Sequence, residues 1–349
     1  MFPPAHDQQL LFPASQSWHP AALVPSSKIV AEGFVETLRR IELDRTRVKL
    51  ATQHYNSIKN LIEERLPNSQ VRQIGSFQRH TKIRPVSVVD SPGFDCTPPS
   101  AEFSPIDIDA LVCLGDACSL AQPGCGLFPV DALQLVRSVL CSHKQYRLME
   151  PKQDSPVVVL TYSDEFSVEL APCFRNRVSA GSWFRDPPSY LVGAGEMTWQ
   201  KADYDFDSAY ITSKNQQCKG RLIPCIKLIK AFLRNKRVPL KSFHVEILCT
   251  WVLSAWIEVL DQSNIHWSYD HAFAFFLRVV PFFLNQPACF QGSMSPPLQL
   301  TEAAVSTIDT TIENFARLAE KLGKLSGYPD ELSLWKEFFG PPFPSAIES

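Results

Sequence analysis

The chain has 349 residues, of which 45% are hydrophobic and 20% charged, a composition that supports a buried core and excludes a wholly disordered protein. Its 34 Lys and Arg residues against 36 Asp and Glu leave a net charge of -2, which excludes a uniformly basic protein of the histone kind. The first residues lack the basic and apolar regions of a signal peptide, and the longest apolar runs, 248–260 and 272–284, are too short to cross a bilayer. We therefore expect a cytoplasmic protein with no membrane partner.

The first part of the chain mixes predicted helices and strands. Residues 1–26 show no periodicity and predict an irregular arm. Apolar residues then recur at helical spacing up to Pro67, which predicts one helix over 27–65, long enough to back two lobes. A proline-rich loop follows at 85–105. The elements predicted after it are a buried strand at 106–112, a helix at 128–148, and a strand hairpin at 157–162 and 166–170.

Beyond about residue 205 the pattern is helical. The predicted helices are 221–235, 242–260, 270–284 and 302–323. The proline-rich segment 340–344 predicts a loose tail. The sequence therefore predicts an α+β lobe followed by an all-helical lobe, with a ligand cleft between them. The expected boundaries are an arm at 1–26, the α+β lobe at 27–205, the helical lobe at 206–325 and a tail at 326–349.

Three carboxylates stand on predicted strands that are otherwise apolar. Asp107 and Asp109 lie two residues apart, so they share one face of their strand. Two such carboxylates can hold a pair of Mg²⁺ ions about 3.5–4 Å apart, the arrangement used in phosphoryl and nucleotidyl transfer. Asp-x-Asp also occurs by chance on surface loops, but two charges on a core strand are costly unless something binds them. Glu169 is either an ordinary strand charge or a third ligand that can accept a hydroxyl proton.

Two basic regions accompany these carboxylates. Gly75-Ser76 follows a short predicted strand, where a glycine lets the backbone approach a phosphate, and no acid occurs between residues 71 and 84. From Lys214 to His244 there are nine Lys and Arg residues and again no acid. A solvated helix face normally mixes the two signs, so this run favours a site for a polyanion, either a triphosphate or a nucleic acid.

With these motifs in this order, the chain resembles the DNA polymerase β-type nucleotidyltransferases, and among them the cGAS/DncV-like nucleotidyltransferases (CD-NTases) of bacterial anti-phage signalling. The more specific part of the likeness is the pair of segments 222–232 and 239–248, which is similar to the family's helix–loop–helix beside the triphosphate. The resemblance covers roughly residues 27–325. It implies an α+β, polymerase β-like nucleotidyltransferase lobe with a mixed sheet, a long N-terminal spine helix and a C-terminal helical lobe.

The resemblance also implies an activity. Such enzymes join nucleoside triphosphates (ATP, GTP or pyrimidine nucleotides) into a cyclic di- or trinucleotide, release pyrophosphate, and so activate a separate effector protein. Linear oligonucleotide synthesis, nucleotidyl transfer to RNA or protein, and an inactive nucleotide-binding regulator stay open as alternatives. The family's animal branch carries a His/Cys zinc insertion that serves DNA sensing, and no such insertion is visible here, so we do not expect a nucleic-acid activator.

Carried over residue by residue, the likeness implies that Asp107, Asp109 and Glu169 are catalytic and hold two Mg²⁺ ions, for which Mn²⁺ can substitute. The family's third acid is usually Asp, so Glu169 departs from the pattern, as does His80 where a glycine is common. The implied nucleotide-binding residues are Gln73, Gly75, Ser76, Lys227, Lys230 and Ser242. The aromatic residues expected to wall the acceptor side are Trp183, Tyr190, Trp199 and Tyr204.

Overall fold

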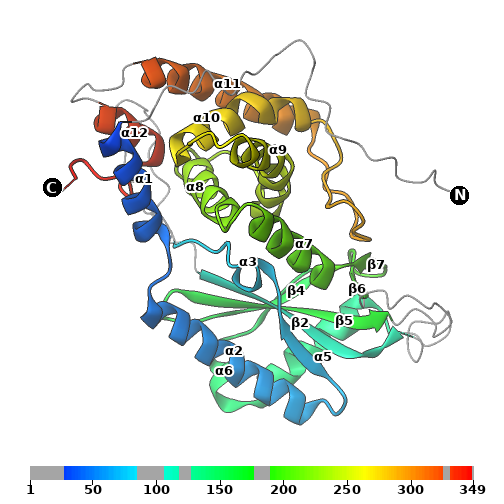
Figure 1. Cartoon of the computed structure of the whole chain (residues 1–349). Coiled ribbons are helices and arrows are strands. Elements are labelled where there is room, and N and C mark those ends of the chain that lie inside the picture. The colour runs from blue at the N-terminus through cyan, green and yellow to red at the C-terminus, as the bar shows by residue number, and fades with distance from the viewer. Residues whose placement is uncertain (1–26, 85–105, 118–126, 177–188, 325–330, 348–349) are drawn as a thin grey trace, which may run out of the picture.

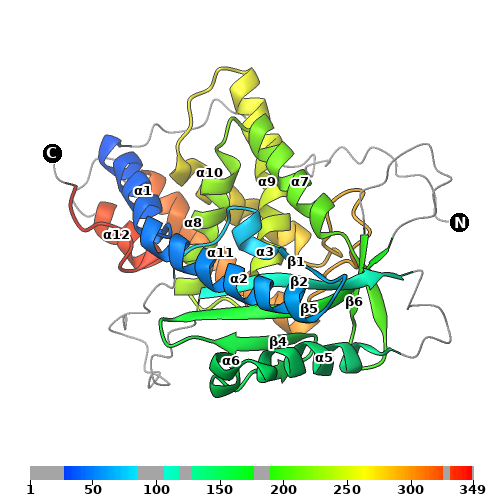
Figure 2. The same ribbon diagram turned by 90° about the horizontal axis from the view of Figure 1, so that it is seen from below.

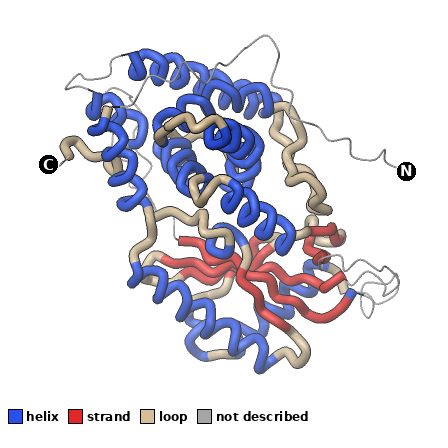
Figure 3. The backbone as a smooth tube through the Cα atoms, in the orientation of Figure 1, coloured by secondary structure: helices blue, strands red, loops and turns tan. Residues whose placement is uncertain are grey.

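A computed structural model of the chain describes residues 27–84, 106–117, 127–176, 189–324 and 331–347. The predicted arm at 1–26, the proline-rich loop and Trp183 lie outside these residues. The described chain forms two lobes, one built on a sheet and one of helices, as the colouring by secondary structure shows (Figure 3).

The sheet lobe is built on a seven-stranded mixed sheet in which five strands follow the order β1-β2-β5-β4-β3, while β6 pairs with β5 and β7 pairs with β6. Only β2 and β5 pair in parallel among the described strands. The strands are β1 (Gln70–Gln73), β2 (Ile106–Asp116), β3 (Lys152–Asp154), β4 (Val157–Thr161), β5 (Phe166–Asn176), β6 (Ser189–Gly193) and β7 (Trp199–Ala202). The predicted strand and the predicted hairpin are therefore present as β2, β4 and β5.

Helices cover one face of this sheet, and the helical lobe lies over the other face (Figure 1). The helices of the sheet lobe are α2 (Arg45–Arg65), α3 (Gly75–Gln78), α5 (Pro129–Ser142) and α6 (Lys144–Leu148). Seen from below, α2 and α5 lie across the strands (Figure 2). Apolar residues of α2, α5 and the sheet form one buried core, which includes Ile62, Val136, Ile108 and Val168. The opposite face of the sheet is thereby left to meet the helical lobe.

The predicted N-terminal spine is helical, but it is two helices instead of one. The first helix, α1 (Lys28–Ile41), ends because Glu42 adopts an extended backbone conformation. Asp44 then caps α2 by accepting a hydrogen bond from the amide of Arg47 at 2.8 Å. The break places α1 in the core of the helical lobe, so the expected boundary of the sheet lobe at residue 27 moves to residue 45.

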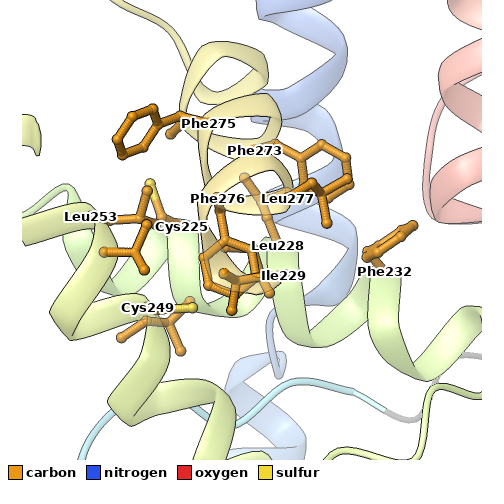
Figure 4. Close-up of a cluster of buried hydrophobic side chains, with 14 of the residues drawn as sticks. Cys225, Leu228, Ile229, Phe232, Cys249, Leu253, Phe273, Phe275, Phe276 and Leu277 are labelled. Carbon is orange, nitrogen blue, oxygen red and sulfur yellow. The ribbon is translucent and has the colours of Figure 1, made fainter. Parts of the chain in front are cut away.

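The helical lobe consists of α1 and the helices that follow β7. These are α7 (Tyr204–Gln217), α8 (Leu222–Asn235), α9 (Ser242–Gln262), α10 (Tyr269–Val279), the 3₁₀ turn η2 (Val280–Phe283), α11 (Glu302–Lys324) and α12 (Glu331–Phe339). Phe232 of α8 meets Phe273 of α10 edge to face with ring centroids 4.9 Å apart, and both belong to the buried cluster of this lobe (Figure 4). One helix of the described chain, α9, is long and apolar enough to cross a membrane, but 72% of its apolar window is buried in this lobe.

The C-terminal segment corrects the expected loose tail at 326–349. Helix α12 and the turn after it bury Trp335, Phe338, Phe339 and Phe343, each at most 3% exposed. The rings of Trp335 and Phe343 pack against Phe34 of α1 at centroid distances of 4.9 and 5.5 Å. The prolines that follow α12 end the helix without loosening the chain, because burial of these large rings stabilises the segment.

Candidate active site

The register of β2 and β5 brings the three predicted carboxylates together. Asp109 pairs directly with Glu169 across the two parallel strands, and Asp107 pairs with Ser167. The alternate residues, such as Ile108 and Val168, face the core of the sheet lobe. Because side chains alternate along a strand, the three carboxylates emerge on the other face, toward the helical lobe.

Gly75 begins α3 against the second aspartate. Its φ is +74°, and a Cβ atom at this position would lie 1.9 Å from Oδ2 of Asp109. The amide of Ile74 donates to the carbonyl oxygen of Asp109 at 2.9 Å, which fixes the turn to β2. Glycine is therefore required twice here, by the left-handed backbone and by the close approach of the carboxylate. The predicted Gly75-Ser76 turn thus lies beside the predicted acids.

Burial and mutual repulsion raise the pKa of two of the three carboxylates, although Lys82 lies close to them. Burial raises the pKa of Asp109, and the charge of Asp107 raises it further. Burial, followed by the charges of Asp109 and Asp107, raises the pKa of Glu169 to about 7. Lys82 is the nearest described counter-charge, with Nζ 3.7 Å from Oδ2 of Asp107. Ser167 donates a hydrogen bond to Oδ1 of Asp107 at 2.6 Å, which orients that side chain.

These three side chains fit a hard divalent cation by their chemistry. Carboxylate oxygens are the ligands that Mg²⁺ prefers, and a bound cation would offset the mutual repulsion of these three groups. Among the described residues, no group of three His, Cys, Asp or Glu side chains is already gathered at metal-binding distance. The carboxylates would therefore have to turn toward an ion in order to bind it together.

A central cavity of about 200 Å³ lies between the carboxylates and the helical lobe. Asp107 and Asp109 line one side, and Ser76 lines it from α3. From the helical lobe, Ser242 and Lys230 line it. Arg234 and Lys82, which are not among the residues implied by the resemblance, line it too. The cavity thus collects acids from the sheet and cations from both lobes.

Lys230 differs from its expected role, because its charge is already balanced. The side chain is 6% exposed, and Nζ donates hydrogen bonds to Oε1 of Glu246 and, at 3.1 Å, to Oγ1 of Thr81. Glu246, which is fully buried, also accepts hydrogen bonds from Arg79 at 2.5 Å and from Thr81 at 2.6 Å. Lys230 is therefore part of a buried ionic network, in which its main described partner is the carboxylate of Glu246.

Glu246 and Arg79 are the residues that reasoning from the sequence missed. Glu246 is the only acid in the first 16 residues of α9, where an isolated charge on an apolar helix signals a buried partner. Arg79 was part of the acid-free segment around Gly75-Ser76, but its partner 167 residues away could not be read from the pattern.

Two predicted nucleotide-binding residues do not reach the central cavity. Nζ of Lys227 donates to Oε1 of Glu42 at 2.7 Å, because this turn of α8 lies against the end of α1. Gln73 pairs with Ala110, so both lie on the face of the sheet opposite Asp109. We therefore withdraw both residues from the site.

The basic run does not form one continuous basic face. Lys219 and Arg221 both pair with Asp261, while Lys227 pairs with Glu42. The acids that are absent within the run are thus supplied by distant parts of the chain. This segment therefore does not form a broad basic surface that could bind a nucleic acid.

An apolar cavity of about 280 Å³ adjoins the carboxylates on their other side. Asp109 and Glu169 line its polar end, and Tyr204 and Phe243 are its aromatic residues. Of the described aromatics expected on the acceptor side, only Tyr204 lines it. Tyr190 is fully buried and donates to Asp205 at 2.9 Å, and Trp199 packs on Phe174 with ring centroids 5.1 Å apart.

Comparisons with known proteins agree with the predicted resemblance. No family model matches the chain. The chain is 22% identical over 343 residues to a probable cyclic nucleotide synthase of Bacillus cereus, an alignment that covers 93% of this chain and 99% of that protein.

Solved structures give the same likeness in fold. CdnC of Escherichia coli MS115-1, solved in a complex with HORMA-deltaN, superposes with a TM-score of 0.61 at 15% identity over 92% of this chain and 99% of that one. Escherichia coli DncV with 3'-deoxy GTP bound superposes with a TM-score of 0.60 at 13% identity over 87% and 93%. The resemblance to the CD-NTases and the predicted fold class are confirmed.

Proposed function

Because the chain has the CD-NTase fold and aligns along nearly its whole length with a probable cyclic nucleotide synthase, we propose that it is a nucleotidyltransferase that makes a cyclic di- or trinucleotide. Its substrates are nucleoside triphosphates, and pyrophosphate is released. The observation that carries this proposal is the parallel register of β2 and β5. That register sets Asp109 beside Glu169, next to a cavity lined by cations.

In this proposal the three carboxylates hold two Mg²⁺ ions, or Mn²⁺ in their place. When bound, the ions would stabilise the negative charge that develops on the α-phosphate. The donor triphosphate occupies the central cavity, where Ser76 and Ser242 offer hydroxyl groups and Arg234 offers positive charge. Gly75 lets the backbone approach the phosphates without a side chain in between.

The acceptor nucleotide occupies the apolar cavity. Its base can stack on the rings of Tyr204 and Phe243, and its ribose then lies toward Asp109 and Glu169. Glu169 accepts the proton of the ribose hydroxyl that attacks the α-phosphate. Glu169 lines the apolar cavity, so its carboxylate lies on the side where this hydroxyl would enter.

The proposed biological role follows the family resemblance. The cyclic product acts on a separate effector protein in anti-phage defence, and synthesis takes place in the cytoplasm, where the triphosphates are found. The support is the sequence likeness to the probable cyclic nucleotide synthase.

The test is incubation of the full chain with each pair of α-³²P-labelled nucleoside triphosphates and Mg²⁺ or Mn²⁺, without nucleic acid. We expect label that resists phosphatase, with the mass of a cyclic di- or trinucleotide. Asp109→Asn should abolish it, whereas Asp116→Asn, at the far end of the same strand β2, should not. A ladder of linear products, or nucleotide binding without any conversion, would refute cyclic synthesis.

A further inference from the structure

Most cations that line the central cavity or the cavity next to it are paired with this chain's own carboxylates, with two exceptions among the described residues. Lys82 faces Asp107, while Arg79 and Lys230 both bind Glu246. Arg234 and Arg237 have no carboxylate at ion-pair distance among the described residues. The guanidinium of Arg234 donates only a long hydrogen bond, of 3.4 Å, to the carbonyl oxygen of Arg84.

Both unbalanced arginines line a second cavity, of about 290 Å³, which we call the basic cavity. It shares Lys230, Arg234 and Ser242 with the central cavity, so the two adjoin. Its other lining residues are Arg237 and the apolar side chains of Leu233, Val238, Leu240 and Val245. None of the described residues that line it is acidic, so it presents net positive charge to any ligand.

The N-terminus of α9 adds hydrogen-bond donors to this cavity. Ser242 is the first residue of this 21-residue helix and lines both cavities. The residue before it, Lys241, makes no side-chain cap to the first turn. The amides of that turn therefore keep their attraction for an anion, which the helix dipole strengthens.

We propose that the basic cavity binds inorganic pyrophosphate after it leaves the central cavity. This inference rests on the proposed function. In the transfer, the acceptor oxygen forms a bond to the α-phosphorus as the bond from that phosphorus to the bridging oxygen breaks. Pyrophosphate takes the electron pair of the broken bond, and the hydroxyl proton passes to Glu169.

The order of groups along the two cavities gives the direction of departure. Asp107 and Asp109 line the central cavity and not the basic cavity, and Lys230, Arg234 and Ser242 lie at the boundary between the two. Once it leaves the central cavity, a highly charged anion is attracted by the two arginines that have no ion-pair partner among the described residues. It therefore moves away from the reacting atoms, toward Arg237.

The experiment is isothermal titration calorimetry of the full chain with pyrophosphate, and separately with the unreactive donor analogue α,β-methylene-ATP. Arg237→Ala removes a cation of the basic cavity at an exposed position, so the fold should survive. Its neighbour gives a matched control, because Lys236 does not line the cavity and donates to the carbonyl oxygen of Glu337. Arg237→Ala should weaken pyrophosphate binding about tenfold, as expected for loss of one charge-assisted hydrogen bond.

Lys236→Ala should leave pyrophosphate affinity unchanged, and both variants should bind the analogue within about twofold of the wild type. Unchanged pyrophosphate affinity in Arg237→Ala would overturn the inference. Equal losses for pyrophosphate and the analogue would overturn it too, because Arg237 would then belong to the donor site. Binding is measured without turnover, so the two proposals fail separately: a wild type that makes no nucleotide product refutes the proposed function, whereas only the pyrophosphate affinity of Arg237→Ala relative to Lys236→Ala tests the basic cavity.

Discussion

Replacing Gly75 by alanine tests the geometry of the site most directly. The added Cβ would lie 1.9 Å from Oδ2, 2.7 Å from Cγ and 2.8 Å from Cβ of Asp109, and the backbone φ is +74°. An L-residue in this left-handed region costs about 1–2 kcal/mol by itself. Because the three contacts include Cβ, turning the carboxylate alone cannot relieve the overlap, and the aspartate must leave its position.

The chain offers a control that separates these two effects. Gly220 has a φ of +80° and nothing within 4 Å of its added Cβ, so Gly220→Ala carries the backbone cost without the overlap. We expect urea unfolding to show a loss of about 1–2 kcal/mol for Gly220→Ala. Gly75→Ala should lose about 1–3 kcal/mol more, the cost of an overlap that only a shift of the backbone can relieve.

Gly75→Ala and Gly220→Ala should differ far more in activity than in stability. A displacement of a reacting group by about 1 Å can cost 10²-fold in rate, so Gly75→Ala should lose at least that much cyclic product. Gly220→Ala should keep wild-type turnover, because Gly220 lies at the turn between α7 and α8. Wild-type turnover in a folded Gly75→Ala protein would refute the assignment of Asp109 to the reacting centre.

Three further changes test separate parts of the molecule. Glu169→Gln should lower turnover at least ~10²-fold by removing the proton acceptor, measured with labelled triphosphates, while Glu169→Asp keeps the charge and most of the activity. Phe343→Ala should cost about 3–5 kcal/mol in urea unfolding because the ring is fully buried, whereas Phe282→Ala, at a side chain 49% exposed, should cost little. Burial raises the pKa of Asp207 from 3.8 to about 6, so its contribution to stability is largest below pH 4 and is lost as pH rises through 6. In thermal melts, the free energy of unfolding of Asp207→Asn relative to that of the wild type should rise by up to about 3 kcal/mol from pH 4 to pH 8.

Each of these expectations has an outcome that contradicts it. Equal turnover in wild type and Glu169→Gln would remove Glu169 from the chemistry. A Phe343→Ala protein as stable as the wild type would support the original prediction that the C-terminal segment is loose. Parallel stability curves for wild type and Asp207→Asn would show that Asp207 keeps an ordinary pKa.

The fold could be predicted largely because its main elements carry strong local patterns. The alternation in β2 and β5 placed the three acids on one face, and the apolar spacing in α8 and α9 gave the central helices. The break after Ile41 was missed because apolar periodicity continues across it. The chain breaks there because α1 packs in the core of the helical lobe, whereas α2 packs in the core of the sheet lobe.

The candidate site was predicted less completely, because charges find their partners through the fold. Lys227 and Glu42 are 185 residues apart, and Lys230 is held by both Glu246 and Thr81. A run of cations without acids therefore says little about which cation is available to a ligand. The spacing of the aromatic residues in α12 is typical of a packed helix, but the prolines that follow it led to the prediction of a loose tail.

The buried carboxylate of Glu246 also limits how the two lobes can move. It accepts hydrogen bonds from Arg79 and Thr81, which belong to the turn beside the sheet, and from Lys230 of the helical lobe. Separating the lobes at this point would leave several buried polar groups unpaired, at about 1–3 kcal/mol each. Rotation of one lobe against the other would therefore pivot about Glu246, and the part of the central cavity that Glu246 lines would stay in place.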